Sequence, residues 1–435
     1  MNQFGLLRQR RFAPFFWTQF LGAFNDNVYK NALIILIAFE LAQGGEGHLL
    51  INAAAGLFIL PFFLFSATAG QLCDRAEKSA LIRRIKLAEI LIMLAAAAAL
   101  LAKHTAALIG LLFLMGAQSS VFGPVKYAIL PQQLRREELV GGNGLVEMGT
   151  FLAILLGTLL GGLLIAIPGW GTQAVAAAVV ALATLGWLSS RGIPPAPAAA
   201  PELRLRFNIA AATWANLRHL GADRVQLATA LGISWFWFYG ATLLTQIPNF
   251  TRLSLGGNEQ VVTLLLTAFS LGIGAGSLAV ESLSRRRIVL WVTLLGGAGM
   301  VGFGLALPAL VGLLPAGTEL RGAAEFLRAG GGGVLAAVVL LGVSGGLYIV
   351  PLFALIQRRA VANHRARVIA GVNILNAAFM VGSAVLAGAL LGSGASIPQL
   401  ISAVALLTVL VLLGLALALQ RQLGGLGVVP EDELA

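Results

Sequence analysis

Charged and amide side chains that interrupt long apolar stretches are the residues with the clearest capacity for chemistry. Asn25, Asp26 and Asn27 are consecutive, and Lys126 and Glu147 interrupt later apolar stretches. An ionisable group in the middle of a bilayer costs at least about 2.5–3.5 kcal/mol. A ligand that carries both charges needs one anionic and one cationic contact, which Asp26 and Lys126 can provide. We therefore predict that these two residues form the centre of a polar binding site.

Two interpretations are open for the neighbours of this pair. Lys30 follows Asp26 by four residues, so both lie on one helix face and can neutralise each other as an internal ion pair. Alternatively, Asp26 serves the ligand together with Lys126. Glu147 either contributes to the site, pairs with Lys126, or caps helix backbone.

The elements that must position these residues are membrane-spanning helices. The chain has 435 residues, of which 58% are hydrophobic and only 11% are charged, and its mean hydropathy is +0.89. So little charge cannot cover a water-soluble globule, whereas lipid requires no such cover. Apolar stretches long enough to cross about 30 Å of hydrocarbon recur twelve times. The predicted spans are 14–41, 52–72, 83–102, 106–130, 143–167, 172–190, 223–250, 258–281, 288–314, 332–357, 366–392 and 397–420.

The basic residues predict the topology. The net charge of +11 lies in short clusters between the apolar runs, mostly on one side, which is the positive-inside pattern and not the pattern of a nucleic-acid-binding protein. We expect both termini in the cytoplasm, an inner-membrane location, and a retained first span instead of a cleaved signal peptide. The single cysteine, Cys73, and four scattered histidines predict neither a disulfide framework nor a metal site.

A polar, proline-bearing linker divides the spans into two groups of six. The predicted domains are an N-terminal six-helix bundle over 1–190, a cytoplasmic linker over 191–222, and a C-terminal six-helix bundle over 223–435. Pro124 near the end of the fourth span is matched by Pro351 near the end of the tenth. Two similar halves of this kind are typical of transporters whose substrate site lies between them.

The loop between the second and third spans resembles the loop motif of the major facilitator superfamily. In that motif a glycine allows close helix approach, and an aspartate meets basic residues at the cytoplasmic gate. Gly70, Asp74, Arg75 and Lys78 fit the motif, while Glu77 stands where the superfamily prefers glycine. We predict a gate element here, and the alternative is a basic loop that only sets topology.

Longer motifs resemble the bacterial lysophospholipid transporter family, which belongs to the same superfamily. They are Phe24-Asn-Asp-Asn27, Pro124-Val-Lys-Tyr-Ala-Ile-Leu130, Asn143-Gly-Leu-Val-Glu147 with Leu155-Leu-Gly157, and Val350-Pro-Leu-Phe-Ala-Leu-Ile-Gln357. The version with Lys30 is most similar to the transporter portion of members fused to acyltransferase and acyl-carrier-protein ligase domains. The resemblance implies an all-α integral membrane protein with the twelve-helix major facilitator fold. It carries Asp26, Lys126 and Glu147 over as substrate-binding residues, beside which Asn25, Asn27, Lys30 and Tyr127 complete the candidate site.

The resemblance also implies a function. Family members move lysophosphatidylethanolamine-like lipids from the outer to the inner leaflet, which implies alternating access with lateral lipid entry and a functional link to an acyltransferase. The expected partners are the lysophospholipid substrate and membrane lipid, and the expected state is a monomer.

The alternative is a proton-coupled exporter of small drugs or metabolites, in which Asp26 titrates. We expect no enzyme, because His219-Leu-Gly-Ala-Asp223 is one residue short of the acyltransferase spacing. We expect no cofactor, because no phosphate-binding loop of the G-x-x-x-x-G-K-[ST] type is present.

Overall fold

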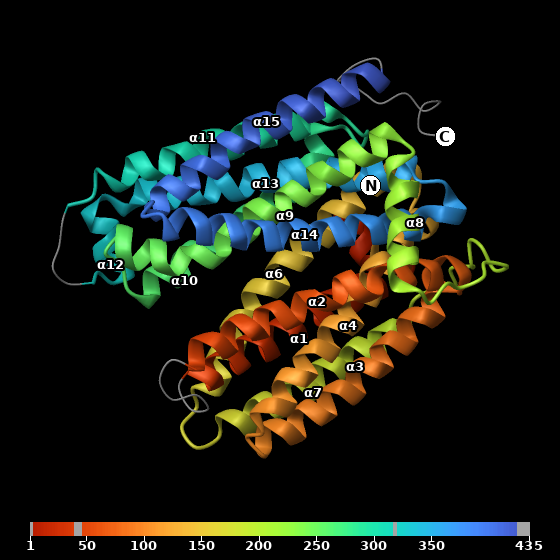
Figure 1. The fold of residues 1–435 in the computed structure, drawn as a ribbon, viewed down its shortest axis with the longest axis horizontal. Helices are drawn as coiled ribbons and strands as arrows, with labels where there is room; N and C mark the ends of the chain where they lie inside the picture. Colours follow the sequence, from red (N-terminus) through yellow and green to blue (C-terminus); the bar gives the residue numbers. More distant parts are fainter. Residues whose placement is uncertain (1–2, 39–45, 316–319, 424–435) are drawn as a thin grey trace. The chain divides into compact units, whose positions relative to one another are not determined.

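The computed structural model describes residues 3–38, 46–315 and 320–423, which form α-helices joined by short connections (Figure 1). Twelve of the helices in these ranges have 20 or more residues. They are α1 (Ala13–Leu36), α2 (Glu46–Arg75), α3 (Lys78–Leu101), α4 (Thr105–Ala128), α6 (Leu139–Ile165), α7 (Gly171–Ser190), α9 (Arg224–Asn249), α10 (Glu259–Leu283), α11 (Leu290–Val311), α13 (Gly332–Arg359), α14 (Arg365–Gly392) and α15 (Ile397–Leu423). The shorter helices are α5 (Leu130–Gln133), α8 (Ile209–Gly221) and α12 (Ala323–Phe326), and 3-10 or π turns occupy Gln3–Arg8, Arg136–Glu138, Phe250–Ser254, Leu327–Gly331 and Ala362–His364.

The long helices follow the predicted spans closely. The largest shift is in α2, which starts at Glu46 instead of residue 52, and the end of the predicted 14–41 span lies outside the described residues. Ten helices in the described ranges are long and apolar enough to cross a membrane. The other two long helices, α1 and α3, contain the polar run Asn25–Lys30 and the charged pair Lys86 and Glu89. Helices α1 and α3 are therefore less apolar than the other ten because they contain these groups, whereas α4 and α6 remain apolar enough despite Lys126 and Glu147.

Side-chain caps fix the start of several long helices. Glu77 accepts hydrogen bonds from the backbone N–H groups of Ser79 and Ala80 at the start of α3. Asp223 does the same for Val225 and Gln226 at the start of α9, and its second carboxylate oxygen lies 2.6 Å from Nε of Arg359. Such caps satisfy N–H groups that the first helical turn leaves unpaired.

The chain folds into two compact units. Unit 1 comprises Met1–Arg136, Leu152–Gly221 and Ala360–Ala377, and unit 2 comprises Glu137–Phe151, Ala222–Arg359 and Ala378–Ala435. Helices α6 and α14 each contribute one part to unit 1 and the other part to unit 2. The predicted six-helix bundles, 1–190 and 223–435, divide the chain by the similarity of its two halves in sequence and not by contact. They stay a prediction.

Unit 1 has an apolar core between α1, α3, α4 and α7. Tyr29 of α1 is fully buried, and its hydroxyl donates a hydrogen bond to the carbonyl oxygen of Leu108 at 2.8 Å. Leu33, Met93 and Val179 pack in the same cluster from α1, α3 and α7. A buried hydroxyl paired in this way avoids the cost of an unsatisfied polar group in an apolar environment.

Unit 2 contains a close helix crossing. Helices α10 and α13 meet through Gly272, Gly276, Gly342 and Gly346, and a Cβ atom at any of them would overlap backbone atoms of the opposite helix. Small residues permit this approach, and backbone packing replaces the hydrophobic driving force that is absent between helices in lipid.

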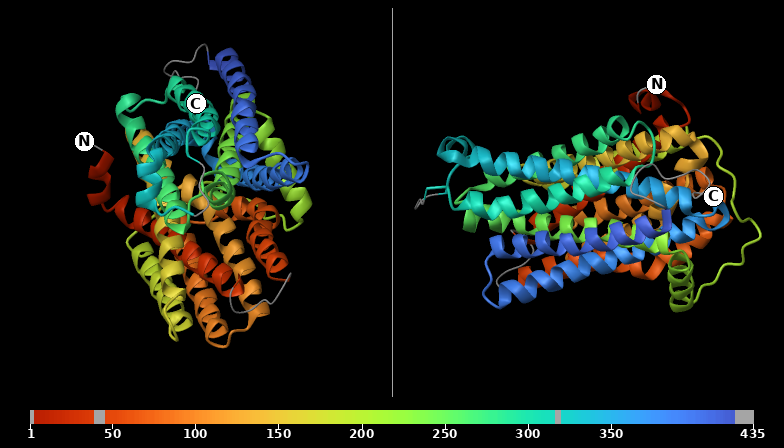
Figure 2. Two further views of the ribbon diagram at one scale, coloured as in Figure 1. Left: turned by 90° about the vertical axis from the view of Figure 1, so that its left-hand side faces the viewer. Right: turned by 90° about the horizontal axis from the view of Figure 1, so that it is seen from above.

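The predicted linker is an ordered part of unit 1. Backbone hydrogen bonds join Lys78 N to Ala196 O at 2.9 Å and Ala200 N to Asp74 O at 2.8 Å. The linker then forms α8, which runs crosswise to α2 near the end of the unit (Figure 2). Sequence analysis did not predict this helix.

Candidate functional site

A cluster of buried polar side chains lies between α1, α3 and α4 of unit 1. At its centre, Nζ of Lys86 donates to Oε2 of Glu89 at 2.6 Å, and both side chains are only 1% exposed. Asn25 donates to the other carboxylate oxygen at 3.2 Å, and Gln118 donates to Oε2 at 3.1 Å. The Lys86 ammonium also lies 5.0 Å from the centre of the Phe122 ring. We call Asn25, Asp26, Lys86, Glu89, Gln118 and Ser119 the unit 1 polar cluster.

Asp26 joins this cluster through a serine that sequence analysis did not select. The Ser119 hydroxyl donates to Oδ2 of Asp26 at 2.6 Å. Asp26 interacts electrostatically with Glu89, Lys86 and Lys30. In the described part of the chain it forms no direct salt bridge with Lys30, whose ammonium lies 5.5 Å from the centre of the Phe58 ring. Asp26 and Lys30 therefore interact over a longer range than a salt bridge. The direct contact of the Asp26 side chain is with Ser119 on α4.

The charges of this region balance. Two cations, Lys30 and Lys86, accompany two carboxylates, Asp26 and Glu89, so their formal charges sum to zero. Isolated charges would be expelled from such an environment, whereas paired and hydrogen-bonded charges are tolerated. The region therefore carries no formal net charge.

One face of α4 connects this cluster to Lys126. Ser119 and Lys126 are seven residues apart, which places them on one helix face about 10 Å apart along the axis. Between them lies Gly123, where an added Cβ atom would meet the side-chain amide of Asn373 on α14. The Lys126 ammonium lies 5.0 Å from the centre of the Tyr127 ring.

Several buried polar atoms in unit 1 have hydrogen-bonding capacity to spare. Within the described residues, Asn25 Oδ1, Asp26 Oδ1 and Asn373 Nδ2 have no hydrogen-bond partner. Buried polar atoms are nearly always paired, so each exception requires an explanation such as a bound polar ligand or water. Two of these atoms are acceptors and one is a donor, which suits a ligand with both kinds of group.

The remaining predicted binding residues have separate environments. Asn27 is turned back to its own helix, where its amide donates to the Ala23 carbonyl oxygen at 2.7 Å. Tyr127 is buried in α4, and Glu147 is fully buried in the part of α6 that belongs to unit 2. The structure thus brings Asn25 and Asp26 into one cluster and gives Asn27 a local contact.

The predicted gate residues occupy one end of unit 1. Asp74 at the end of α2 accepts hydrogen bonds from backbone N of Ala366 at 3.0 Å and of Arg367 at 3.3 Å, and from Nε of Arg367 at 3.0 Å. Gly70 permits this contact, because a Cβ atom there would lie 2.7 Å from Cβ of Ala370 and 2.9 Å from the carbonyl oxygen of Ala366. Asp74 therefore joins α2 to the first turn of α14, where unpaired N–H groups and the helix dipole favour an anion.

Glu77, which departs from the superfamily pattern, holds the linker. It accepts a hydrogen bond from Ala196 N at 2.6 Å while capping α3. Burial raises the pKa of Glu77, but hydrogen bonds from Ala196, Ser79 and Ala80 outweigh burial and hold this pKa below its ordinary value. Lys78 is buried and donates to the Pro197 carbonyl oxygen at 3.5 Å, whereas Arg75 is exposed.

Two family-like motifs meet inside unit 2. The side-chain amides of Asn143 and Gln357 exchange two hydrogen bonds, at 2.9 and 2.8 Å, and both residues are fully buried. This reciprocal pair joins the start of α6 to the end of α13. It gives these motif residues a packing role that their positions 214 residues apart in the sequence do not reveal.

Sequence analysis missed Lys86, Glu89, Gln118, Ser119 and Asn373. The Glu89 side chain is buried at the centre of the polar cluster. The available signal was the spacing of Lys86 and Glu89, which places opposite charges three residues apart inside an apolar span. For metals, the described residues contain no group of three or more His, Cys, Asp or Glu side chains that could hold an ion.

The fold and the buried charges define a class of protein, a multi-pass helical membrane transporter. The sequence profile described as Major Facilitator Superfamily matches residues 15–381. The crystal structure of the human organic anion transporter MFSD10 (TETRAN) has a TM-score of 0.72 at 13% identity, covering 93% of this chain and 99% of that chain. This structural likeness concerns the fold, and it confirms the predicted all-α membrane fold of the major facilitator type.

Proteins of similar sequence indicate the family within this class. The lysophospholipid transporter LplT of Enterobacter sp. (strain 638) is 29% identical over 346 residues, which cover 78% of each chain. The lysophospholipid transporter LplT of Escherichia coli O139:H28 (strain E24377A / ETEC) is 30% identical over 351 residues, again covering 78% of each. The chain belongs to the major facilitator superfamily and, within it, to the lysophospholipid transporter family.

Proposed function

We propose that this protein moves lysophospholipids of the lysophosphatidylethanolamine type across the bacterial inner membrane, from the outer to the inner leaflet. Family membership supports a transporter of such lipids. The observation that carries the proposal is the set of buried charged and unpaired polar groups on α1, α3 and α4. Groups of this kind inside an apolar helical unit are retained where they serve a substrate.

The proposed contacts follow from the charges of the head group. The phosphate would bind the Lys126 ammonium, because a charge-assisted hydrogen bond is about twice as strong as a neutral one. The ammonium of the head group would bind Asp26, whose Oδ1 has no hydrogen-bond partner in the described residues. Glu147 is a second candidate for the ammonium, and Asn25, Asn27, Lys30 and Tyr127 are the other proposed binding residues.

The acyl chain is proposed to stay in lipid during transport. Each methylene that leaves lipid for water loses roughly 0.8 kcal/mol. A head group that enters from the side of the protein avoids this loss, so a lateral entrance is favoured over an aqueous one.

Alternating access would depend on the contact of Asp74 with the start of α14. This contact consists of three hydrogen bonds and sits at a glycine-dependent helix crossing. Breaking it would free α2 from α14 at this end of unit 1. We propose that Gly70, Asp74, Arg75 and Lys78 form a gate on this basis.

Import of labelled lysophosphatidylethanolamine into inverted and right-side-out vesicles tests the function. We expect Lys126→Ala to lower import at least about tenfold, because a charge-assisted contact is lost. Lys103→Ala, which removes an exposed lysine, is the matched control and should import normally. Wild-type import by a folded Lys126→Ala variant would contradict the proposed role of Lys126.

The same vesicles test the alternative. Import that persists without a proton gradient favours a lipid carrier that needs no proton coupling, while drug efflux that collapses with a protonophore favours the exporter.

We also propose cytoplasmic termini, a monomeric state and a functional link to an acyltransferase that would consume the imported lysolipid. Reporter fusions at each terminus and light scattering of the purified protein test the first two.

A further inference from the structure

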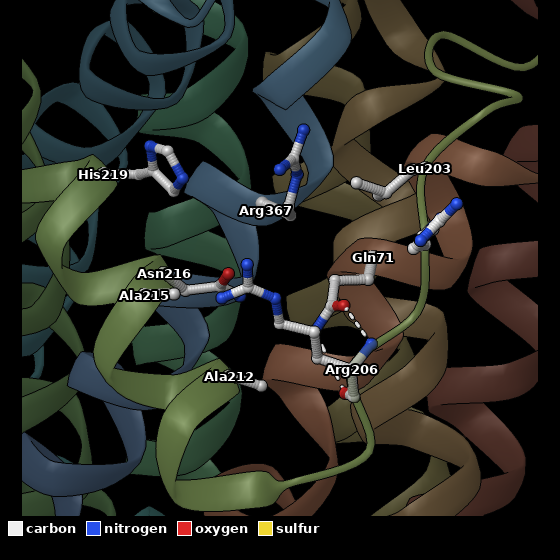
Figure 3. A pocket seen from close by; sticks show the side chains of 9 residues that line it. Gln71, Leu203, Arg206, Ala212, Ala215, Asn216, His219 and Arg367 are labelled. Atoms are coloured by element: carbon white, nitrogen blue, oxygen red, sulfur yellow. Dashed lines mark hydrogen bonds between the residues drawn. The ribbon is translucent and has the colours of Figure 1, made fainter.

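A basic pocket lies at the end of unit 1 that carries the Asp74 contact. Its volume is about 240 Å³, and it is lined by the end of α2, the linker, α8 and the first turn of α14 (Figure 3). The polar residues that line it are Gln71, Arg204, Arg206, Asn216, His219 and Arg367. No carboxylate is among the lining residues, so the pocket is cationic.

The backbone of Arg206 is held in position by a side chain of α2. Gln71 accepts a hydrogen bond from Arg206 N at 2.8 Å and donates one to Arg206 O at 3.4 Å. The Arg206 side chain then reaches across the pocket toward Asn216 on α8 (Figure 3). In the described ranges the guanidinium groups of Arg204 and Arg206 form neither an ion pair nor a hydrogen bond with another side chain, so they are available to an anion.

Arg367 connects the pocket to the gate contact. Its Nε donates to Asp74 at 3.0 Å and its Nη2 donates to the Asn363 carbonyl oxygen at 2.7 Å. His219 of α8 also lines the pocket, and its pKa is lowered by burial and by the positive charges of Arg367 and Arg218. A neutral imidazole can donate one hydrogen bond to an anion without adding charge.

Large apolar side chains stand on the same segment. Phe207 is 74% exposed and Trp214 is 71% exposed, although the linker and α8 are otherwise rich in basic residues. On α8, Ala212, Asn216 and Leu220 face inward at a spacing of four residues, while Trp214 and Arg218 face outward. A helix with this pattern typically lies in the interface between lipid head groups and acyl chains.

We propose that the basic pocket binds the phosphate group of an anionic phospholipid in the adjacent leaflet. Phosphate fits the donor set, because arginine guanidinium groups bind phosphate oxygens through paired hydrogen bonds. Phe207 and Trp214 favour a phosphate that is attached to acyl chains over a soluble one. Basic pockets beside membrane helices are a recurrent means of lipid recognition.

Such a lipid would act at a place distinct from the substrate cluster. The polar cluster comprises residues of α1, α3 and α4, whereas the pocket comprises α2, the linker, α8 and α14. Because Arg367 belongs to both the pocket and the Asp74 contact, the bound phosphate tunes the strength of the gate. A ligand that binds the folded state also stabilises it.

Thermal unfolding of the delipidated protein in mild detergent tests the proposal. We expect phosphatidylglycerol to raise the unfolding midpoint saturably, and phosphatidylethanolamine or inorganic phosphate at equal concentration to have little effect. Arg206→Gln should raise the half-saturating phosphatidylglycerol concentration about tenfold, because charge-assisted hydrogen bonds are lost. Arg84→Gln removes the same charge from an exposed position near the start of α3, outside the pocket, and should respond like the wild type.

Three results would overturn the proposal. Equal lipid affinity of the wild type and Arg206→Gln would exclude the pocket, and an equal loss of affinity in Arg84→Gln would indicate diffuse surface charge. If inorganic phosphate raised the unfolding midpoint as much as phosphatidylglycerol does, the ligand would be a soluble phosphate and not a lipid. If Arg206→Gln does not fold, Arg204→Gln replaces it, since Arg204 is exposed and also lines the pocket.

Discussion

Glu89 is the residue that gathers most of the buried polar groups of unit 1. Three side chains from three helices donate to its carboxylate, namely Asn25, Lys86 and Gln118. A carboxylate that is 1% exposed is stable in its charged form only with such partners. Its role is therefore to hold the helices that carry Asp26 and Ser119 in a fixed relation.

At this scale, Lys86→Met should be strongly destabilising. It leaves the Glu89 charge buried without its cation, and breaking a buried pair costs about 3–5 kcal/mol. The double variant Lys86→Met with Glu89→Gln removes both charges and should recover most of this loss. Unfolding free energies from detergent titrations measure the difference, and a double variant as unstable as the single one would refute the pairing.

Residue types in the sequence indicated some members of the polar cluster but not which side chains form hydrogen bonds with one another. The polar run Asn25–Lys30 was visible because charge inside an apolar span is expensive. The partner of Asp26 was not visible, because Ser119 is uncharged and lies 93 residues away in the sequence. Which carboxylate meets which donor depends on helix rotation and packing, and periodicity alone does not specify these.

At the scale of elements, the reciprocal amides of Asn143 and Gln357 link α6 to α13. Each amide satisfies both a donor and an acceptor of the other. Truncating one partner leaves the other buried and unsatisfied, whereas truncating both does not.

A double-mutant cycle on this pair has a definite expected result. Asn143→Ala and Gln357→Ala should each lower the unfolding free energy by about 1–3 kcal/mol. The combined variant should lose less than the sum, with a coupling of about 0.5–3 kcal/mol. Strict additivity would show that the two amides do not act together.

The helices themselves were largely predictable from the sequence. An apolar run that crosses a membrane must satisfy its backbone hydrogen bonds within itself, which leaves the helix as the solution. The exception is α8, which is short and lies in a proline-bearing segment, so neither length nor hydropathy indicated it. Its inward face became evident only from its packing against α2 through Asn216 and Ala67.

At the scale of the whole molecule, unit 1 draws on segments far apart in the chain. Asp74 and Arg367 are 293 residues apart and meet within this unit. The sequence pattern predicted a gate at Asp74 from its loop motif. It did not predict the start of α14 as the partner, because that contact depends on tertiary packing at Gly70.

Asp74→Asn should weaken this contact and impair transport. An asparagine amide loses the negative charge and places a donor among the N–H groups of Ala366 and Arg367. We expect lysolipid import to fall about tenfold, in line with the loss of charge-assisted hydrogen bonds. Glu202→Gln, which neutralises an exposed carboxylate of the linker, should import normally, and an unaffected Asp74→Asn variant would argue against a gate.

The buried thiol beside Asp74 has a practical consequence. Cys73 is the only cysteine in the sequence, and its side chain is fully shielded from solvent. A maleimide can reach the Cys73 thiol only while this end of the unit is transiently open. The alkylation rate of the unmodified protein therefore measures how often this end opens. The natural chain thus contains its own reporter group, and the influence of substrate, lipid or a distant substitution on the proposed gate can be measured without any engineered label.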